Sequence, residues 1–399
     1  ASNKYANYSD ANADALEAVI SGIGEDYNIF NKSWDSLFDS NGKLTSGTNI
    51  LDNYQNDLDW FDGIERNGLR SQYNLSARGG SKKTTYYMSV GYLNEEGFLK
   101  HSGGERTTGN IKVDATPSNW LKTGLVINGS YQEYNKMSGS ATDNPSSFIN
   151  PFMFSRNIAS IYPVHLHDPA TGQYILDENG NKQFDKGSSR KQYAGRHILW
   201  ETELNRDKTY RTTLDGTAYA DITFLKDFVF SIKGNMNNRN SSNKTYDNSI
   251  IGDGAGKGRM KQVEYRYKNY LLQELLNWRT SFNDIHNVDI VLGHENFNYN
   301  YQYTYLYKTD EKFANVMELS NFNTMTSMTG YQMGYKTEGY FGRGAYNYDQ
   351  TYFGEFSFRR DGSSRFYVDN RWGNFWSLGG SWILSNENYI KKFDWINYL

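Results

Sequence analysis

Apolar and polar side chains alternate with a period of two residues along most of this chain, from Gln72 almost to its end. The segment LKTGLVINGSYQ, residues 121–132, has leucine, isoleucine and tyrosine in one register and lysine, asparagine, serine and glutamine in the other. The same alternation occurs at residues 84–93, 210–224, 228–236 and 376–384. Because successive side chains of a β-strand point to opposite faces of its sheet, the pattern predicts strands with one apolar and one polar face.

The links between these segments alternate between short and long. Short links are expected at Gly80 and Ser81, Pro117 and Ser118, Leu225 and Lys226, Asn283 and Asp284, Asp349 and Gln350, and Asn388 and Tyr389. Long links are expected at residues 94–105, 136–208, 240–261, 297–332 and 361–373. This arrangement is typical of an up-and-down barrel that has short turns at one rim and outside loops at the other.

We therefore predict an all-β fold, an antiparallel transmembrane β-barrel with about twelve strands in residues 71–399. The long links would be extracellular and the short turns periplasmic. Residues 1–70 differ from the rest and are expected to form a connecting extracellular region with a short helix that begins after Asn12.

Composition agrees with a folded chain that is rich in strands and turns. Aromatic residues make up 16% of the 399 residues, with 33 Tyr and 37 Gly against 5 Pro, whereas disordered chains have few aromatics. The net charge of -3, with both signs well mixed, argues against nucleic acid as a partner. The absence of Cys excludes disulfides and thiolate metal sites. No run approaches the roughly 20 apolar residues of a membrane-spanning helix, but a barrel strand needs only alternate apolar residues.

Two segments depart from a simple alternation. Glu274 shares its register with Leu272 and Leu276 on the face expected to meet lipid, and a β-bulge would be needed to turn it away. In FNYNYQYTYLY, residues 297–307, the tyrosines occupy the register opposite to that of the apolar residues at 288–292. We interpret this tyrosine ladder as a ribbon that continues past the bilayer into a loop.

Three motifs resemble ligand sites but lack parts that such sites need. GDGAGKG at residues 252–258 lacks the spacing and the Ser or Thr of a phosphate-binding loop, so we interpret it as a loop tip. His165 and His167 could clamp a metal, yet no third ligand lies nearby, and we expect a polar loop pair. DENGN at residues 177–181 predicts a hairpin turn rather than a calcium site.

The candidate binding residues are aromatic rather than catalytic. The sequence has no nucleophile elbow and no visible grouping of Ser, His and Asp, so we predict no enzymatic activity, no cofactor and no metal. Phe152, Phe154, Tyr162 and Trp200 in the long loops, together with the tyrosine ladder, could stack on the apolar faces of sugar rings. Packing of the loops on one another is the alternative for each of these residues.

The strand that begins near Thr351 ends in a charged cluster. Alternation places Tyr352, Phe356 and Phe358 toward lipid and Glu355, Ser357 and Arg359 toward the lumen. The rim cluster, where the strand leaves the bilayer, consists of Arg359, Arg360, Asp361 and Arg365. We expect Asp361 to pair with neighbouring arginines and to fix the turn at Gly362, a structural role rather than substrate binding.

Several motifs together resemble one family. SQYNLSARGGSKKTTYYMSVGYLNEEGF, then NWLKTGLVINGSY, and later RRDGSSRF followed by NRWGN, are similar to the SusC/RagA-type TonB-linked outer-membrane transporters, also called TonB-dependent receptors, of the Bacteroidetes. The resemblance runs from about Asp59 to the last residue. The chain begins at Ala1 without Met, and no TonB box or plug domain is visible, so we expect an internal fragment of such a barrel.

The resemblance implies a 22-stranded barrel in the outer membrane of a Gram-negative bacterium, with a plug domain that lies outside this chain. It implies active import of large nutrients, chiefly oligosaccharides or glycans and alternatively oligopeptides. The implied partners are a SusD-like surface lipoprotein on the extracellular loops, the TonB-ExbB-ExbD complex, which would act through the missing N-terminal part, and outer-membrane lipid. A passive porin, an adhesive surface barrel and a soluble multi-strand binding module remain the alternatives.

Overall fold

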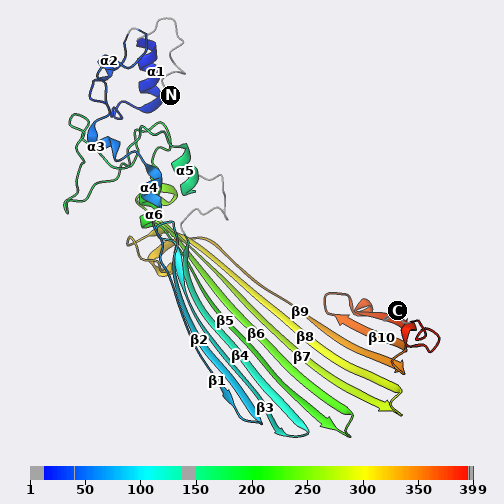
Figure 1. Ribbon diagram of the computed structural model, residues 1–399. Helices are drawn as coiled ribbons and strands as arrows, with labels where there is room; N and C mark the ends of the chain where they lie inside the picture. The colour runs from blue at the N-terminus through cyan, green and yellow to red at the C-terminus, as the bar shows by residue number, and fades with distance from the viewer. Residues whose placement is uncertain (1–12, 40, 137–149, 394, 396–398) are drawn as a thin grey trace.

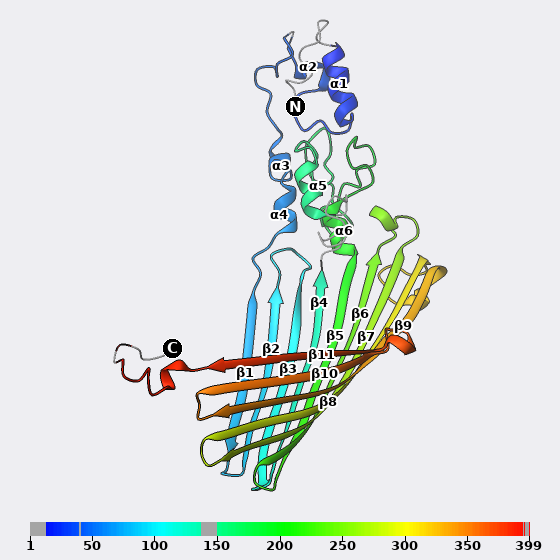
Figure 2. The same cartoon turned by 90° about the vertical axis from the view of Figure 1, so that its right-hand side faces the viewer.

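The computed structural model describes residues 13–39, 41–136, 150–393, 395 and 399. One antiparallel sheet of eleven strands dominates it, and each strand pairs with its neighbours in the sequence (Figure 1). The strands are β1 (Arg70–Gly80), β2 (Thr84–Glu96), β3 (Gly103–Ser118), β4 (Leu121–Lys136), β5 (Arg206–Phe224), β6 (Phe228–Asp247), β7 (Arg259–Phe282), β8 (His286–Glu311), β9 (Phe322–Tyr348), β10 (Tyr352–Ser363) and β11 (Trp372–Trp382). Figure 2 shows that the sheet curls, so that β9–β11 cross in front of β1–β4.

Tight turns join the strands at one end of the sheet. The β5–β6 turn has positive φ at Leu225 and Lys226, the β7–β8 turn at Asn283 and Asp284, and the β9–β10 turn at Asp349 and Gln350. Positive φ at both central residues is the signature of the type I′ hairpin, whose twist matches that of the flanking strands. The sheet is therefore a series of hairpins with a fixed register.

The two faces of the sheet differ in chemistry. We call the face that carries Tyr352, Phe356 and Phe358 the outer face, and the face that carries Glu355 and Arg359 the inner face. Residues directly opposite each other in an antiparallel pair share a face, so the outer face continues through rows such as Phe358, Gly342, Leu292, Leu276 and Phe230. The outer face is apolar yet solvent-exposed, as is expected of a surface that meets lipid.

The strands reach further than the sequence pattern predicts. The described strands β8 and β9 contain 26 and 27 residues, whereas a membrane crossing needs only about 9–11. Among the described residues between β1 and β11, those outside strands at the far rim are 97–102, 150–205, 248–258, 312–321 and 364–371. In the described part of the chain, no strand follows Trp382, so eleven strands replace the expected twelve.

The two segments that depart from simple alternation in the sequence, around Glu274 and at residues 297–307, keep a continuous register. The β-bulge considered at Glu274 is absent, because β7 pairs with β6 and β8 without a shift, and Glu274 lies on the outer face. The tyrosines of residues 297–307 lie on the inner face, because β8 pairs with β9 without a shift from His286 to Tyr307. The tyrosine ladder is thus part of a strand rather than a loop ribbon.

The helices lie beyond the far rim of the sheet (Figure 1). They are α1 (Ala13–Ile23), α2 (Trp34–Leu37), α3 (Asp52–Gln55), α4 (Trp60–Ile64), α5 (Pro151–Asn157) and α6 (Ile198–Leu204). The described parts of the segment before β1 and of the β4–β5 link share one apolar core, and we call residues 17–39, 41–66 and 150–205 together the loop module. Its core consists of Tyr27, Trp60, Ile64, Phe154, Ile158, Tyr162, Val164, Ile198 and Leu199. None of the described helices is both long and apolar enough to span a membrane.

We expect Ile127→Arg or Ile232→Arg to destabilise the inserted full-length barrel by about 2–4 kcal/mol, because an outer-face guanidinium must leave water for hydrocarbon. Urea titration of the protein in lipid vesicles measures this loss. Asn128→Arg and Ser231→Arg are the matched controls, since these neighbours lie on the inner face, and each should cost far less. Equal losses at both kinds of position would show that the faces are assigned wrongly.

Candidate substrate-facing wall and loop module

Tyrosine side chains lie side by side on the inner face of β7, β8 and β9. We call Tyr265, Tyr267, Tyr299, Tyr301, Tyr303, Tyr331 and Tyr335 the tyrosine wall. Ring centroids lie 4.9 Å apart between Tyr267 and Tyr301, and 5.1 Å apart both between Tyr303 and Tyr331 and between Tyr299 and Tyr335. Cross-strand aromatic pairs at these distances stabilise one another. The wall therefore presents broad ring faces and hydroxyl groups to the inner space.

Arginine side chains lie against the tyrosine wall. The guanidinium of Arg239 is 4.4 Å from the ring centroid of Tyr267, and that of Arg365 is 4.0 Å from the ring centroid of Tyr335. These are cation–π distances. The inner face thus combines flat apolar surfaces with fixed positive charges that can donate hydrogen bonds.

A polar hollow of about 360 Å³ lies beside the tyrosine wall on the inner face. Its lining includes Tyr134, Arg211, Arg239, Asn243 and Tyr265. Arg211 Nη2 donates to Tyr134 Oη at 3.2 Å, while Arg211 Nε has no hydrogen-bond partner in the described part of the chain. The volume lies within the range of small-molecule sites, and the hollow could hold one ring of a polar ligand.

The rim cluster divides between the two faces. Arg359 Nε donates to both carboxylate oxygens of Asp361 at 2.7 Å, and Arg359 Nη2 lies 3.3 Å from Glu295 Oε1, all on the inner face. A Cβ atom at Gly339 would lie 2.5 Å from Asp361 Oδ1, so the glycine makes room for this ion pair. Arg360 points to the outer face, 5.2 Å from the Trp372 ring. Asp361 pairs with Arg359 as expected, but Gly362 lies within β10, paired with Glu338 and Trp372, and not in a turn.

The four loop aromatics that the sequence suggested as binding residues lie in different surroundings. Phe154 is fully buried and Tyr162 is 1% exposed, and both belong to the core of the loop module. Neither ring is open to a ligand, so packing of the loops is the role that fits them. Phe152 is 37% exposed. Trp200 is half-buried and stacks on Phe184 with a centroid distance of 5.8 Å.

Asp57 ties the segment before β1 to the β4–β5 link. Its carboxylate lies 2.6 Å from His165 Nδ1 and 2.9 Å from His167 Nε2, and it accepts a hydrogen bond from the backbone N–H of His165 at 2.8 Å. The His167 ring stacks on Tyr54 at 4.1 Å. The two histidines therefore share one carboxylate, and among the described residues no group of three or more His, Cys, Asp or Glu side chains is arranged to hold a metal ion.

Packing of the loop module lowers the pKa of two of its titratable groups, Asp57 and His197. Burial would raise the pKa of Asp57, but hydrogen bonds from His165 and His167 outweigh it and hold that pKa well below its usual range. Burial lowers the pKa of His197 to about 3. Neutral His197 can donate from Nε2 to the Val164 carbonyl at 2.7 Å and accept the backbone N–H of Trp200 at Nδ1. At neutral pH, Asp57 is therefore charged and His197 is neutral, as their hydrogen bonds in the loop module require.

A curved antiparallel sheet with an apolar outer face, a charged inner face and folded loops at one rim defines the class as the wall of an outer-membrane β-barrel. Curated relatives show which proteins the chain is similar to. TonB-dependent receptor P39 of Formosa agariphila is 26% identical over 351 residues, and TonB-dependent receptor SusC of Bacteroides thetaiotaomicron is 25% identical over 347 residues. The chain is a homologue of the SusC-type TonB-dependent receptors and a protein of the outer membrane.

These matches cover 86% and 84% of this chain but only 31% and 33% of the relatives, so the chain spans about one third of their length. The RagAB peptide importer in its closed-closed state has the same fold. Its TM-score is 0.68 at 20% identity, and the match covers 94% of this chain and 40% of that chain. No protein-family profile matches the sequence.

Sequence reasoning missed the role of Asp57 and the inner position of the tyrosines. The contact between Asp57 and His165 joins residues that are far apart in the sequence, and no local pattern indicates it. The alternation within residues 297–307 did carry a signal. If the register is followed without interruption from Val288, the tyrosines fall on the inner face.

We expect Asp57→Asn to loosen the loop module by about 2–3 kcal/mol, because the two histidines lose a charged acceptor in a buried setting. Hydrogen exchange of peptides from residues 150–205 in the full-length protein measures the loss, with faster exchange expected there and no change in β6–β8. Asp62→Asn, at an exposed carboxylate of α4, is the control. Unchanged exchange in Asp57→Asn would contradict the bridging role.

We expect the loop module to become less stable as the pH falls. His197 has a lowered folded pKa, so its contribution is complete above its unfolded pKa of about 6.5 and declines toward the folded value, by at most about 1.4 kcal/mol per pH unit. Asp57 also has a lowered folded pKa, so its contribution is lost only below about pH 4. Hydrogen exchange across this pH range checks the order, and greater protection at pH 5 than at pH 7 would contradict it.

Proposed function

We propose that this chain supplies part of the wall and outer loops of an active importer of large nutrients, with oligosaccharides or glycans as substrates. The observation that carries the proposal is the tyrosine wall. Its rings face the inner space, lie on strands longer than a bilayer crossing, and have cationic side chains against them. Aromatic planes bind the apolar faces of sugars, while guanidinium and hydroxyl groups hydrogen-bond to their edges.

Oligopeptides are the second candidate substrates. The inner face carries ion-pairing side chains of both signs, such as Arg343 with Glu355 and Arg279 with Asp289, each at 2.6 Å. Peptide termini and charged side chains suit such a surface. The solved structures named as the RagAB peptide importer, which share the fold, also support this candidate.

The proposed partners follow from the relatives and from the place of the loop module. We infer that a SusD-like surface lipoprotein covers the loop module, since a folded unit at the far rim gives such a partner a firm surface. Energy for uptake would come from TonB, ExbB and ExbD through parts of the receptor outside this chain. The first test is whether the full-length receptor co-purifies with a SusD-like lipoprotein from the same cells. The second is whether uptake is lost in a strain that lacks TonB. Uptake that persists without TonB would favour a passive barrel.

We expect Tyr301→Ala combined with Tyr303→Ala to raise the half-saturation concentration for uptake of the oligosaccharide roughly tenfold, because two stacking planes are lost. The measurement is initial uptake by cells that carry the full-length variant at wild-type abundance. Tyr270→Ala is the control, since that ring lies on the outer face of β7. Equal effects of the two changes would exclude the tyrosine wall as a contact surface. An effect on oligopeptide uptake alone would favour the second candidate.

A further inference from the structure

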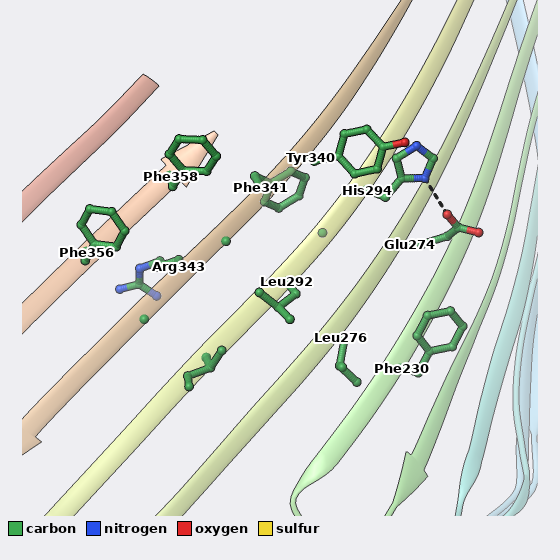
Figure 3. A pocket seen from close by; sticks show the side chains of 14 residues that line it. Phe230, Glu274, Leu276, Leu292, His294, Tyr340, Phe341, Arg343, Phe356 and Phe358 are labelled. Atoms are coloured by element: carbon green, nitrogen blue, oxygen red, sulfur yellow. Dashed lines mark hydrogen bonds and ion pairs between the residues drawn. The ribbon is translucent and has the colours of Figure 1, made fainter. Parts of the chain in front are cut away.

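An apolar groove of about 660 Å³ lies on the outer face of β6–β10 (Figure 3). Its floor is formed by Gly342 and Gly344 of β9, which present no side chains. Leu292 of β8 lies on one side, and Phe356 and Phe358 of β10 lie on the other. The groove runs along the strands, and its volume is typical of sites that hold small molecules.

Polar side chains lie at the end of the groove nearer the loops, where Glu274, His294 and Tyr340 form part of its lining. Glu274, His294, Tyr340 and Arg360 lie directly opposite one another on four adjacent strands, all on the outer face. His294 Nδ1 lies 2.7 Å from Glu274 Oε2 and His294 Nε2 lies 3.3 Å from Glu338 Oε1. Tyr340 donates to the same Glu338 oxygen at 2.7 Å. We call Glu274, His294, Glu338, Tyr340 and Arg360 the outer polar row.

The outer polar row marks a level in the membrane. Arg and Lys side chains on a lipid-facing strand cost about 2–4 kcal/mol at mid-membrane and about 0–1 kcal/mol near the interface, and Asp and Glu cost less. The next outer-face positions toward the short turns are Leu276, Leu292 and Phe358. The outer polar row therefore lies where hydrocarbon gives way to headgroups, and the groove lies at the depth of acyl chains.

We propose that the groove binds one acyl chain of an outer-membrane lipid whose zwitterionic headgroup, a phosphate joined to a primary amine, sits on the outer polar row. The carboxylates of Glu274 and Glu338 are 36% and 40% exposed and would accept from the amine. Arg360, directly opposite Tyr340, would donate to the phosphate. The outer polar row holds two carboxylates with His294 between them and the guanidinium of Arg360 beside them, so a headgroup that carries both charges is the complementary choice.

This lipid site is separate from the proposed uptake of substrate, because the groove and the tyrosine wall lie on opposite faces of the same strands. Glycine at positions 342 and 344 has a clear purpose in this arrangement. A Cβ atom at Gly344 would meet no heavy atom within 4 Å. A larger side chain there would fill the groove without displacing the sheet, which makes the site testable.

The test uses the full-length receptor in nanodiscs of equimolar dioleoyl phosphatidylethanolamine and dioleoyl phosphatidylglycerol, followed by native mass spectrometry of the lipids it retains. We expect phosphatidylethanolamine to be retained roughly tenfold over phosphatidylglycerol, as for one charge-assisted hydrogen bond. Gly344→Phe should remove the retained lipid. Gly129→Phe, in an open outer-face position on β4, should leave it in place.

Glu274→Gln combined with Glu338→Gln keeps the side-chain shapes and should abolish the preference for phosphatidylethanolamine while lipid is still retained. Soluble phosphoethanolamine should fail to displace the lipid, since it lacks the chain that the groove holds. The proposal would be overturned if the Gly344→Phe variant retained as much lipid as the wild type, or if the double variant kept the wild-type headgroup preference. It would also be overturned if Gly344→Phe prevented association of two receptor copies without loss of lipid, which would identify the groove as a protein interface.

Discussion

The uninterrupted hydrogen-bond register of the long hairpins decides where almost every side chain in this sheet points. From His286 to Tyr307, β8 pairs with β9 without a shift, and β7 pairs with both of its neighbours without a shift. A slip of one residue would move every apolar side chain from lipid to the inner space. The type I′ turns help to prevent such a slip, because they fix the alignment of the strands that they join.

Much of the fold follows from alternation alone, since period two predicts strands and the pattern of links predicts the barrel rims. The strand ends could not be found in this way. Above the bilayer the outer face turns polar, as at Asn296, Asn298 and Asn300 of β8, and both faces then look like loop sequence. Backbone pairing continues there regardless, because each strand is held by neighbours of similar length. Polarity reports the solvent that a side chain meets and not the end of a strand.

The candidate site was less predictable than the fold, and the loop module shows why. Phe154 and Tyr162 are aromatic residues of the kind that stack on ligands. In the structure they are buried in a core formed by residues before β1 and after β4. That core depends on contacts such as the hydrogen bond from Trp60 Nε1 to the Tyr162 carbonyl, which join segments far apart in the sequence. Aromatic residues in the strands were easier to assign, because the register gives each of them a face.

At the rim, consecutive residues of one strand serve the inner and the outer face in turn. Arg359 joins the inner ion pair with Asp361, while Arg360 belongs to the outer polar row. On β8, His294 faces outward and Glu295 faces inward toward Arg359. The tyrosine wall begins just beyond this level on the inner side, so one band of residues both marks the membrane boundary outside and opens the substrate-facing surface inside. Because strand register links the two faces, a shift of the barrel in the membrane would move the tyrosine wall by the same distance.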